Sequence, residues 1–397
     1  MDHEKLIDTL LVRIDKGATA DELLESSMKT SSADYHREVV QAFGTWERFL
    51  TELAITARGM ENQQPTGPSR VALEDEERPE RSVGAGATRP VTVLTHEGQI
   101  LNMSLDKLPA TRVPELREFP AGPGSFAPHK LVLGIFDTGL ALFTNKGNII
   151  VVDRRLLAEH KPGEHVRPLG NRFPGIEEGE GIVDVMPLSY LRNQERYYTV
   201  TSLGQIKASN TTELHRISRE PSVGFLLKGS DKLIAAFAAP RRSQVYAGGS
   251  HAKAIQFSTS DIRSQGRKAT GVRAISLGTD EEVVSAFPLR GGKRNIALVT
   301  SAGVIKRMPM REFRKQGRGG GGLQSCRLNS GDKVASMAQV SLGGDLLLLT
   351  STGRFARFPA YDLPFGGRAA KGEPLLSLTP GERVQQILGV PAGEFVV

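Results

Sequence analysis

The sequence predicts a mainly β protein, radial or solenoid in form, made of six similar repeats and preceded by a short helical region. Each repeat contains the same turn: an apolar strand ends, a few polar residues and usually a glycine follow, and a second β-rich run leaves. The turn positions are Gly98, Gly147, Gly204, Ala252, Gly303 and Gly353, with Ala252 replacing the glycine in one worn copy. They are 49, 57, 48, 51 and 50 residues apart, so each repeat is one supersecondary unit about the size of a propeller blade.

Residues 1–59 carry the pattern of helices. Apolar residues recur at helical spacing from Leu6 to Ile14, and Thr19-Ala20-Asp21-Glu22 is a capping box. A longer helix, ending before Gly59, carries an apolar stripe of Val39, Phe43, Trp46, Leu50 and Leu53. Such a stripe packs against neighbouring helices or against a second chain. We therefore expect a helical docking or dimerisation domain, and a homo-oligomer formed through these helices is one of the two outcomes.

Residues 60–89 are predicted to be a flexible acidic linker, because they combine Pro, Gly and Ser with the cluster Glu74-Asp75-Glu76-Glu77 and hold few bulky apolar residues. The charge changes sign after it. Residues 1–90 contain 11 Lys or Arg against 17 Asp or Glu, whereas residues 91–397 contain 40 against 27. A net charge of +13 on the repeats indicates polyanionic partners.

The repeats fill residues 90–397, and each is predicted to hold about four strands. In the fifth repeat a strand runs through Val304-Ile305-Lys306-Arg307-Met308. Later in each repeat comes a strand that begins with glycine, such as Gly271-Val272-Arg273-Ala274-Ile275 in the fourth repeat. An acidic turn and one more apolar strand then complete the repeat. Four strands per repeat is the content of a propeller-like blade.

Composition excludes several classes of protein. No apolar run approaches the length of a membrane span, and the N-terminus lacks the features of a signal peptide. The single cysteine, Cys326, is expected to be buried in a protein of the reducing cytosol. Histidines are scattered without metal-ligand spacing, and the sequence contains neither a Gly-x-Ser-x-Gly nucleophile elbow nor a phosphate-loop lysine motif. We therefore expect no cofactor and no enzymatic activity.

The repeats closely resemble a known family. The signature consists of Thr-Ser-x-Gly followed by Ile-Lys-Arg, the segment Asp261–Arg273, and Gly331-Asp332-Lys333-Val334. Over residues 91–390 these features are similar to the C-terminal domain of the DNA gyrase A subunit and to its topoisomerase IV counterpart. The resemblance implies a six-bladed β-pinwheel in which blades lend strands to their neighbours and duplex DNA wraps around a basic outer rim. It also implies a bacterial, cytoplasmic, nucleoid-associated protein.

One segment, residues 316–322, resembles the gyrase box, Gln-Arg-Arg-Gly-Gly-Lys-Gly. Here Gly317 and Gly321 replace two basic residues, and the segment lies in the fifth repeat, whereas the family's box belongs to the first. Glycines let backbone amides approach phosphate, and arginines neutralise it. The DNA contacts expected around this box are Arg311, Arg314, Lys315, Gln316, Arg318, Gly319 and Gly320. A purely structural glycine loop is the alternative. A dinucleotide site at Gly317, Gly319 and Gly322 is not expected, because a strand, and not a helix, should follow.

Further cations recur at related places in the repeats. A rim that meets DNA once per blade needs cations once per blade, so these residues are expected to form a phosphate track, although any one of them alone is typical of a solvated surface charge. They are Arg154, Arg155, Lys207, Arg263, Arg267, Lys268, Arg273, Lys306, Arg307, Arg354, Arg357, Arg368 and Lys371. Without interleaved aromatic residues, duplex DNA is favoured over single strands.

The pair Arg196-Tyr197 is superficially similar to the Arg-Tyr pair of topoisomerase cleavage centres. It leads into an apolar strand, so a role in the core or the sheet is expected. Residues 1–90, which precede the repeats, are too few for a cleavage core. Two functions follow from the sequence. The first is non-enzymatic binding and bending or wrapping of duplex DNA. The second is a protein-interaction propeller that scaffolds an assembly, and its candidate partners include a topoisomerase.

Overall fold

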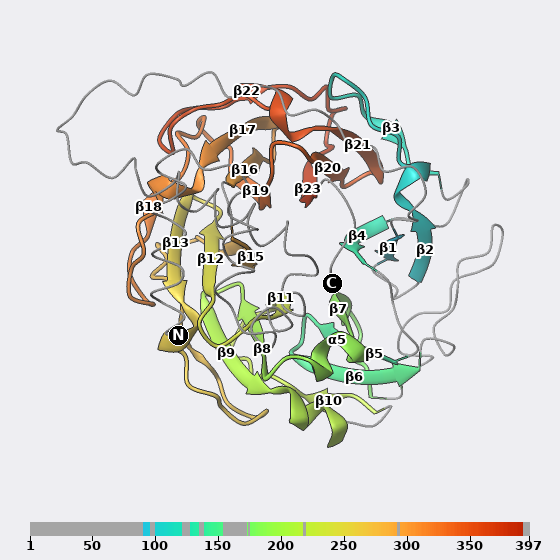
Figure 1. Ribbon diagram of the computed structural model, residues 1–397, viewed down its shortest axis with the longest axis vertical. Helices are drawn as coiled ribbons and strands as arrows, with labels where there is room; N and C mark the ends of the chain where they lie inside the picture. The colour runs from blue at the N-terminus through green and yellow to red at the C-terminus, as the bar shows by residue number, and fades with distance from the viewer. Residues whose placement is uncertain are drawn as a thin grey trace, which may run out of the picture. The chain divides into compact units, whose positions relative to one another are not determined.

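The computed structural model describes residues 90–95, 100–120, 128–134, 139–153, 173, 175–216, 220–291 and 294–391. The helical domain expected at residues 1–59 and the linker expected at 60–89 lie outside this part of the chain. In the described residues the strands form six antiparallel sheets, and each sheet is one blade of a ring (Figure 1). The prediction of a mainly β protein with six propeller-like repeats is confirmed.

Each blade begins with a hairpin followed by an inner strand that lines the centre of the ring. Blade 1 holds β1 (Pro90–Thr95), β2 (Ile100–Ser104) and β4 (Pro128–Leu133), and blade 2 holds β5 (Gly139–Thr144), β6 (Asn148–Asp153) and β7 (Ile182–Pro187). Blade 3 holds β8 (Arg196–Thr201), β9 (Gln205–Asn210) and β11 (Leu233–Ala238), and blade 4 holds β12 (Gln244–Gly249), β13 (Lys253–Ser258) and β15 (Val283–Leu289). Blade 5 holds β16 (Asn295–Thr300), β17 (Val304–Pro309) and β19 (Val334–Val340), and blade 6 holds β20 (Asp345–Thr350), β21 (Arg354–Pro359) and β23 (Val384–Val390).

The repeated Thr and Gly of the hairpin turns have distinct physical roles. In four blades the Thr Oγ1 accepts a hydrogen bond of 3.1–3.2 Å from the backbone N–H four residues later, as Thr201 does from Gln205. The glycine that precedes this N–H has a φ between +81° and +84°, a conformation that costs other residues energy. Ala252 takes the same left-handed conformation, with a φ of +62°. The fourth repeat therefore keeps the same turn without the glycine.

A short outer strand connects successive blades. After the hairpins of blades 3 to 6 the chain crosses to the preceding blade and adds two residues to its outer edge: β10 (Ser222–Val223) to β6, β14 (Val272–Arg273) to β9, β18 (Leu323–Gln324) to β13, and β22 (Glu373–Pro374) to β17. The first repeat adds β3 (Arg117–Glu118) to β21 of blade 6. This last exchange closes the ring, because it joins the start of the repeat region to its end.

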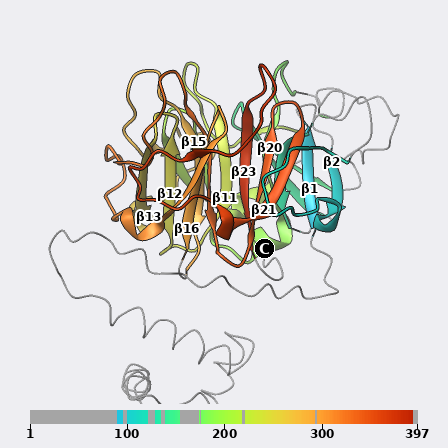
Figure 2. The ribbon, with the colours of Figure 1, turned by 90° about the horizontal axis from the view of Figure 1, so that it is seen from above.

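A short helix begins each of these five described crossings. These helices are η1 (Leu105–Lys107), η4 (Thr211–Arg216), η5 (Thr259–Asp261), η6 (Met310–Glu312) and η7 (Ala360–Asp362), all of the 3-10 type. One α-helix in the described residues, α5 (Leu188–Arg192), joins β7 to β8. Seen from the side, strands near the centre such as β11 and β23 run roughly along the axis of the ring (Figure 2).

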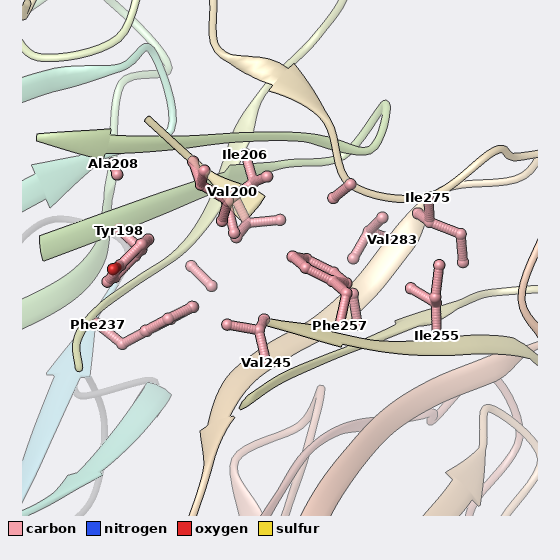
Figure 3. Close-up of a cluster of buried hydrophobic side chains, with 14 of the residues drawn as sticks. Tyr198, Val200, Ile206, Ala208, Phe237, Val245, Ile255, Phe257, Ile275 and Val283 are labelled. Carbon is pink, nitrogen blue, oxygen red and sulfur yellow. The ribbon is translucent and has the colours of Figure 1, made fainter. Parts of the chain in front are cut away.

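The hydrophobic core is divided among the junctions between blades. Ile296 and Leu298 of β16 pack into the junction with blade 4, whereas Ala297 and Val299 pack into the junction with blade 6. Because successive strand residues point to opposite faces, a strand between two junctions is apolar throughout. The cluster between blades 3 and 4 shows this arrangement, with Tyr198 and Val200 facing Val245 and Phe257 (Figure 3).

The six inner strands surround a central cavity of about 690 Å³. Side chains at one equivalent position of these strands reach the backbone of the next inner strand. For example, the Met337 N–H donates to Ser285 Oγ over 2.8 Å, and the Ile387 N–H donates to Ser336 Oγ over 3.2 Å. The residues at this position are Lys130, Asp184, Ser285, Ser336 and Gln386, and the sixth is Ala235. Polar side chains thus link five of the six junctions between the described inner strands.

Candidate nucleic-acid interface

The segments that cross between blades form loops on the outer edge of the ring. We name them by repeat: rim loop 1 is residues 105–118, rim loop 3 is 211–223, rim loop 4 is 259–273, rim loop 5 is 310–324 and rim loop 6 is 360–374. Rim loops 4 and 5 are fixed by the same contact. The Gln265 N–H donates to Ala208 O over 2.8 Å, and the Gln316 N–H donates to Gln256 O over 2.8 Å. Equivalent residues of these loops therefore hold equivalent places on successive blades.

The glycines of residues 316–322 serve two purposes. Gly319 and Gly322 have φ values of +79° and +71°, and a Cβ on Gly322 would lie 2.8 Å from Ala254 O. The Gly319 N–H donates to Ala274 O over 2.7 Å, so this amide is already used inside the protein. By contrast, an added Cβ on Gly317 or Gly321 would have no described atom within 4 Å. The first pair packs the loop onto its neighbours, and the second pair lies in open space.

Cationic side chains on rim loops 4 and 5 are largely solvent-facing. Arg263, Lys268 and Arg273 are exposed in rim loop 4, with Arg267 half-buried, and Arg311, Arg314, Lys315 and Arg318 are exposed in rim loop 5. Gln316 is half-buried. None of these cations forms an ion pair with a carboxylate of a described residue. Their charge is available to a polyanion in solution.

One arginine occupies the same place in three successive rim loops. Arg267, Arg318 and Arg368 each follow a glycine at the tip of the loop. Arg318 Nε donates to Asp261 O over 2.9 Å, and Arg368 Nη1 donates to Gln324 O over 2.9 Å. Each of these two side chains therefore ties its own loop to the preceding rim loop. A guanidinium has five N–H donors, so donors remain for a phosphate after this contact.

Two lysines among the expected rim cations are buried, which corrects the prediction that they face DNA. Lys207 and Lys306 are no more than 1% exposed. Lys207 Nζ donates to Arg267 O over 2.7 Å and lies 5.2 Å from the Phe225 ring centroid, and Lys306 Nζ donates to Arg368 O and Ala370 O over 2.8 Å each. Burial lowers the pKa of each lysine to about 8. The rim loop of the next repeat covers each amine, so these residues hold the loop and do not reach its surface.

Three further expected cations are engaged within the protein. Arg307 is buried, with its guanidinium 4.6 Å from the Phe365 ring centroid and 5.6 Å from that of Tyr361. Arg357 is also buried, and its Nε donates to Asp345 Oδ2 over 2.8 Å. Arg354 forms a bidentate ion pair with Glu382, and this pair lowers the pKa of the carboxyl far below its usual range. The prediction that Arg307 and Arg357 face DNA is therefore wrong, because both lie in the interior.

The remaining expected positions are divided. Arg368 is half-buried and Lys371 is exposed in rim loop 6, whereas Arg154 and Arg155 lie outside the described residues. The burial of Lys207 and Lys306 had a signal in the sequence. When the repeats are aligned on their turn residues, both lysines fall at the position of Ile255, which is buried. An interior position in one repeat predicts an interior position in the others.

Within the described residues, the alternative chemistries that the sequence raised find no site. Tyr197 lies fully buried in β8, and burial raises its pKa to about 12. The sheet role expected for Arg196-Tyr197 is confirmed. Residues 317–322 lead into β18 and not into a helix, as expected, and Cys326 is buried. Over the described ranges, no group of His, Cys, Asp and Glu is placed to hold a metal ion, and no helix is long and apolar enough to span a membrane.

A closed ring of six blades that exchange outer strands and present cationic loops at the rim defines the class: a six-bladed β-propeller of the pinwheel kind. The family model described as "DNA gyrase C-terminal domain, beta-propeller" matches residues 244–290, 294–341 and 344–391. The fold is similar to that of a DNA gyrase A C-terminal domain, with a TM-score of 0.66 and 16% identity, covering 76% of this chain and 100% of that one. A topoisomerase IV C-terminal domain gives a TM-score of 0.61 and 18% identity, covering 76% and 93%.

Curated relatives agree with the family model. The DNA gyrase A protein of Staphylococcus epidermidis is 29% identical over 251 residues, which is 62% of this chain and 28% of the relative. That of Ureaplasma parvum is 28% identical over 270 residues, 65% and 30% of the two chains. The chain thus spans less than a third of the length of these relatives. The resemblance of the repeat region to the gyrase A C-terminal domain is confirmed.

Proposed function

We propose that residues 90–397 bind duplex DNA through the rim of the propeller, without sequence preference and without enzymatic activity, and bend or wrap it. The observation that carries this proposal is the set of exposed cations, free of carboxylate partners among the described residues, on successive rim loops. Lysine and arginine bound to phosphates release condensed counterions, which favours binding irrespective of base sequence. The resemblance to gyrase A C-terminal domains implies the same partner.

Salt dependence tests the electrostatic part of the proposal. Eight exposed cations lie on rim loops 4, 5 and 6. If about six of them neutralise phosphates, the slope of log affinity against log salt concentration should be roughly −5. A slope near zero, or no binding to plasmid DNA at low salt, would contradict DNA binding.

Topology tests the bending or wrapping. Closed circular plasmid is relaxed by a topoisomerase in the presence of the protein, the protein is removed, and the linking number is measured. Protein that wraps or bends DNA in one sense leaves a shift in the distribution of topoisomers. Affinity without such a shift would leave DNA binding in place and exclude wrapping.

The second candidate is a protein-interaction propeller, and one surface feature favours it. Phe365 of rim loop 6 is 39% exposed. It occupies the position that Lys315 has in rim loop 5 and Ser264 has in rim loop 4. An aromatic group at the rim suits a protein partner, and a topoisomerase is the candidate. In either case, we propose that residues 1–59 form a docking or dimerisation domain and that residues 60–89 link it to the propeller. Co-sedimentation of the protein with a topoisomerase, without DNA, would support this candidate.

A further inference from the structure

The charge of the rim is unevenly distributed among the described loops. Rim loops 4 and 5 each hold four Lys or Arg against one acidic residue. Rim loops 1, 3 and 6 hold as many acidic residues as basic ones. In rim loop 1, moreover, Arg117 forms an ion pair with Glu115 over 2.7 Å. The excess positive charge of these loops therefore lies over blades 3 and 4.

Rim loops 4 and 5 are also joined into one surface. Arg318 Nε donates to Asp261 O over 2.9 Å, the Gly319 N–H donates to Ala274 O over 2.7 Å, and the Ser276 N–H donates to Gly320 O over 2.9 Å. The acidic residue of rim loop 5 faces away from this surface. Glu312 Oε2 accepts the Arg368 N–H over 2.6 Å and so lies against rim loop 6. The Arg318 side chain and the backbones that carry the other cations are thus held in fixed relation, without a nearby carboxylate from Glu312.

We propose that duplex DNA is held mainly on this arc of two loops over blades 3 and 4, and not evenly around the whole rim. The inference rests on the proposed function, because it assigns the place of the same DNA contact. Preorganised cations bind phosphate better than scattered ones, since less conformational freedom is lost on binding. Phosphates that cross from one loop to the other would meet exposed cations on both loops.

Three variants of the full chain with equal changes of charge test the arc. The first replaces Arg311, Arg314, Lys315 and Arg318 of rim loop 5 by Gln. The second makes the same change at Lys107, Arg112, Lys371 and Arg383, which are exposed outside the arc. The third replaces Arg154, Arg155, Arg167 and Arg172, basic residues between β6 and β7 that lie outside the described part of the chain. Affinity for a short duplex is measured over a range of salt, and thermal unfolding checks the fold.

The rim loop 5 variant should bind at least tenfold more weakly, and its salt slope should be shallower by about 3, since each lost phosphate contact removes about 0.9. The other two variants should lose less than threefold. A triple variant, Arg263→Gln, Lys268→Gln and Arg273→Gln, keeps the Arg318 contacts and should also lose at least fivefold. Equal losses in all sets, or a larger loss in the third variant, would overturn the arc but leave DNA binding intact. Failure of the unaltered protein to bind at low salt would overturn both.

Discussion

At the scale of single residues, the decisive property of each cation is whether a neighbouring repeat covers it. Lys306 and Arg318 are both basic residues of the fifth repeat. Lys306 is 1% exposed and donates to carbonyl groups of rim loop 6, whereas Arg318 is exposed at the tip of rim loop 5. The first stabilises a loop, and the second is available to DNA. Different measurements should therefore respond to their loss.

Lys306→Met should destabilise the fold by about 2 kcal/mol, because it leaves the carbonyls of Gly367, Arg368 and Ala370 without this donor. Chemical denaturation measures the free energy of unfolding. Lys371→Met, an exposed change in the same rim loop, is the matched control and should alter it little. Equal stability of the two variants would show that the buried amine contributes nothing.

Arg318→Ala should weaken plasmid binding by about 1–2 kcal/mol without comparable loss of stability, since a charge-assisted hydrogen bond to phosphate is lost. Arg383→Ala, at an exposed site outside the rim loops, serves as the control in the same titration. If both variants bind DNA equally well, the glycine loop is structural and Arg318 only joins two loops.

The buried lysines predict a pH dependence of stability. Burial lowers the pKa of Lys207 and of Lys306 from the ordinary 10.5 to about 8. Between these pH values the unfolded chain binds more protons than the folded one, so the free energy of unfolding should rise with pH in this window. The measurement is the difference between the unaltered protein and the Lys207→Met, Lys306→Met double variant at pH 7.5 and at pH 10. A difference that does not change with pH would contradict burial of charged amines.

At the scale of elements, blades are joined by the polar side chains of their inner strands. Five of the six described junctions carry such a link, and the junction from β11 to β15 has Ala235 at the equivalent position. At the next junction, Ser285 accepts the Met337 N–H. The repeated register places the Ala286 N–H in the same relation to residue 235.

Ala235→Ser should therefore stabilise the fold by about 0.5–1 kcal/mol, the net value of a typical hydrogen bond. The reverse change, Ser285→Ala, should destabilise it by about 1–2 kcal/mol, because the buried Met337 N–H loses its acceptor. Both are measured by chemical denaturation. A destabilising Ala235→Ser would mean that the two strands do not share the register of the other junctions.

At the scale of the whole ring, the first and last repeats close the propeller. Besides the pairing of β3 with β21, the Arg357 guanidinium of blade 6 donates to Leu105 O and Leu108 O of rim loop 1 over 3.0 Å each and to Asp345 Oδ2. One buried cation thus binds both sides of the closing junction.

Arg357→Gln should cost about 3–5 kcal/mol of stability, as expected when one partner of a buried ion pair is removed. Thermal unfolding should also become broader, since the two ends of the repeat array could then separate first. Arg383→Gln is the exposed control from the same blade. Should the two variants unfold alike, closure depends on the strand exchange alone.

The sequence by itself determined the blade and the number of blades. The recurring turn predicts a hairpin, because the Thr hydroxyl and the left-handed glycine act within a few residues of each other, and six copies predict six blades. Taken one repeat at a time, it could not decide which cations reach the surface, although alignment of the repeats places Lys207 and Lys306 with the buried Ile255. Lys207 bonds to Gly266 and Arg267, about 60 positions away in the next repeat, and nothing local to Ile206-Lys207-Ala208 reports that cover. The tertiary structure decides this, because strand exchange places the rim loop of one repeat over the residues of another. A basic residue under such a loop stabilises it, whereas a basic residue on its outer surface is exposed to solvent.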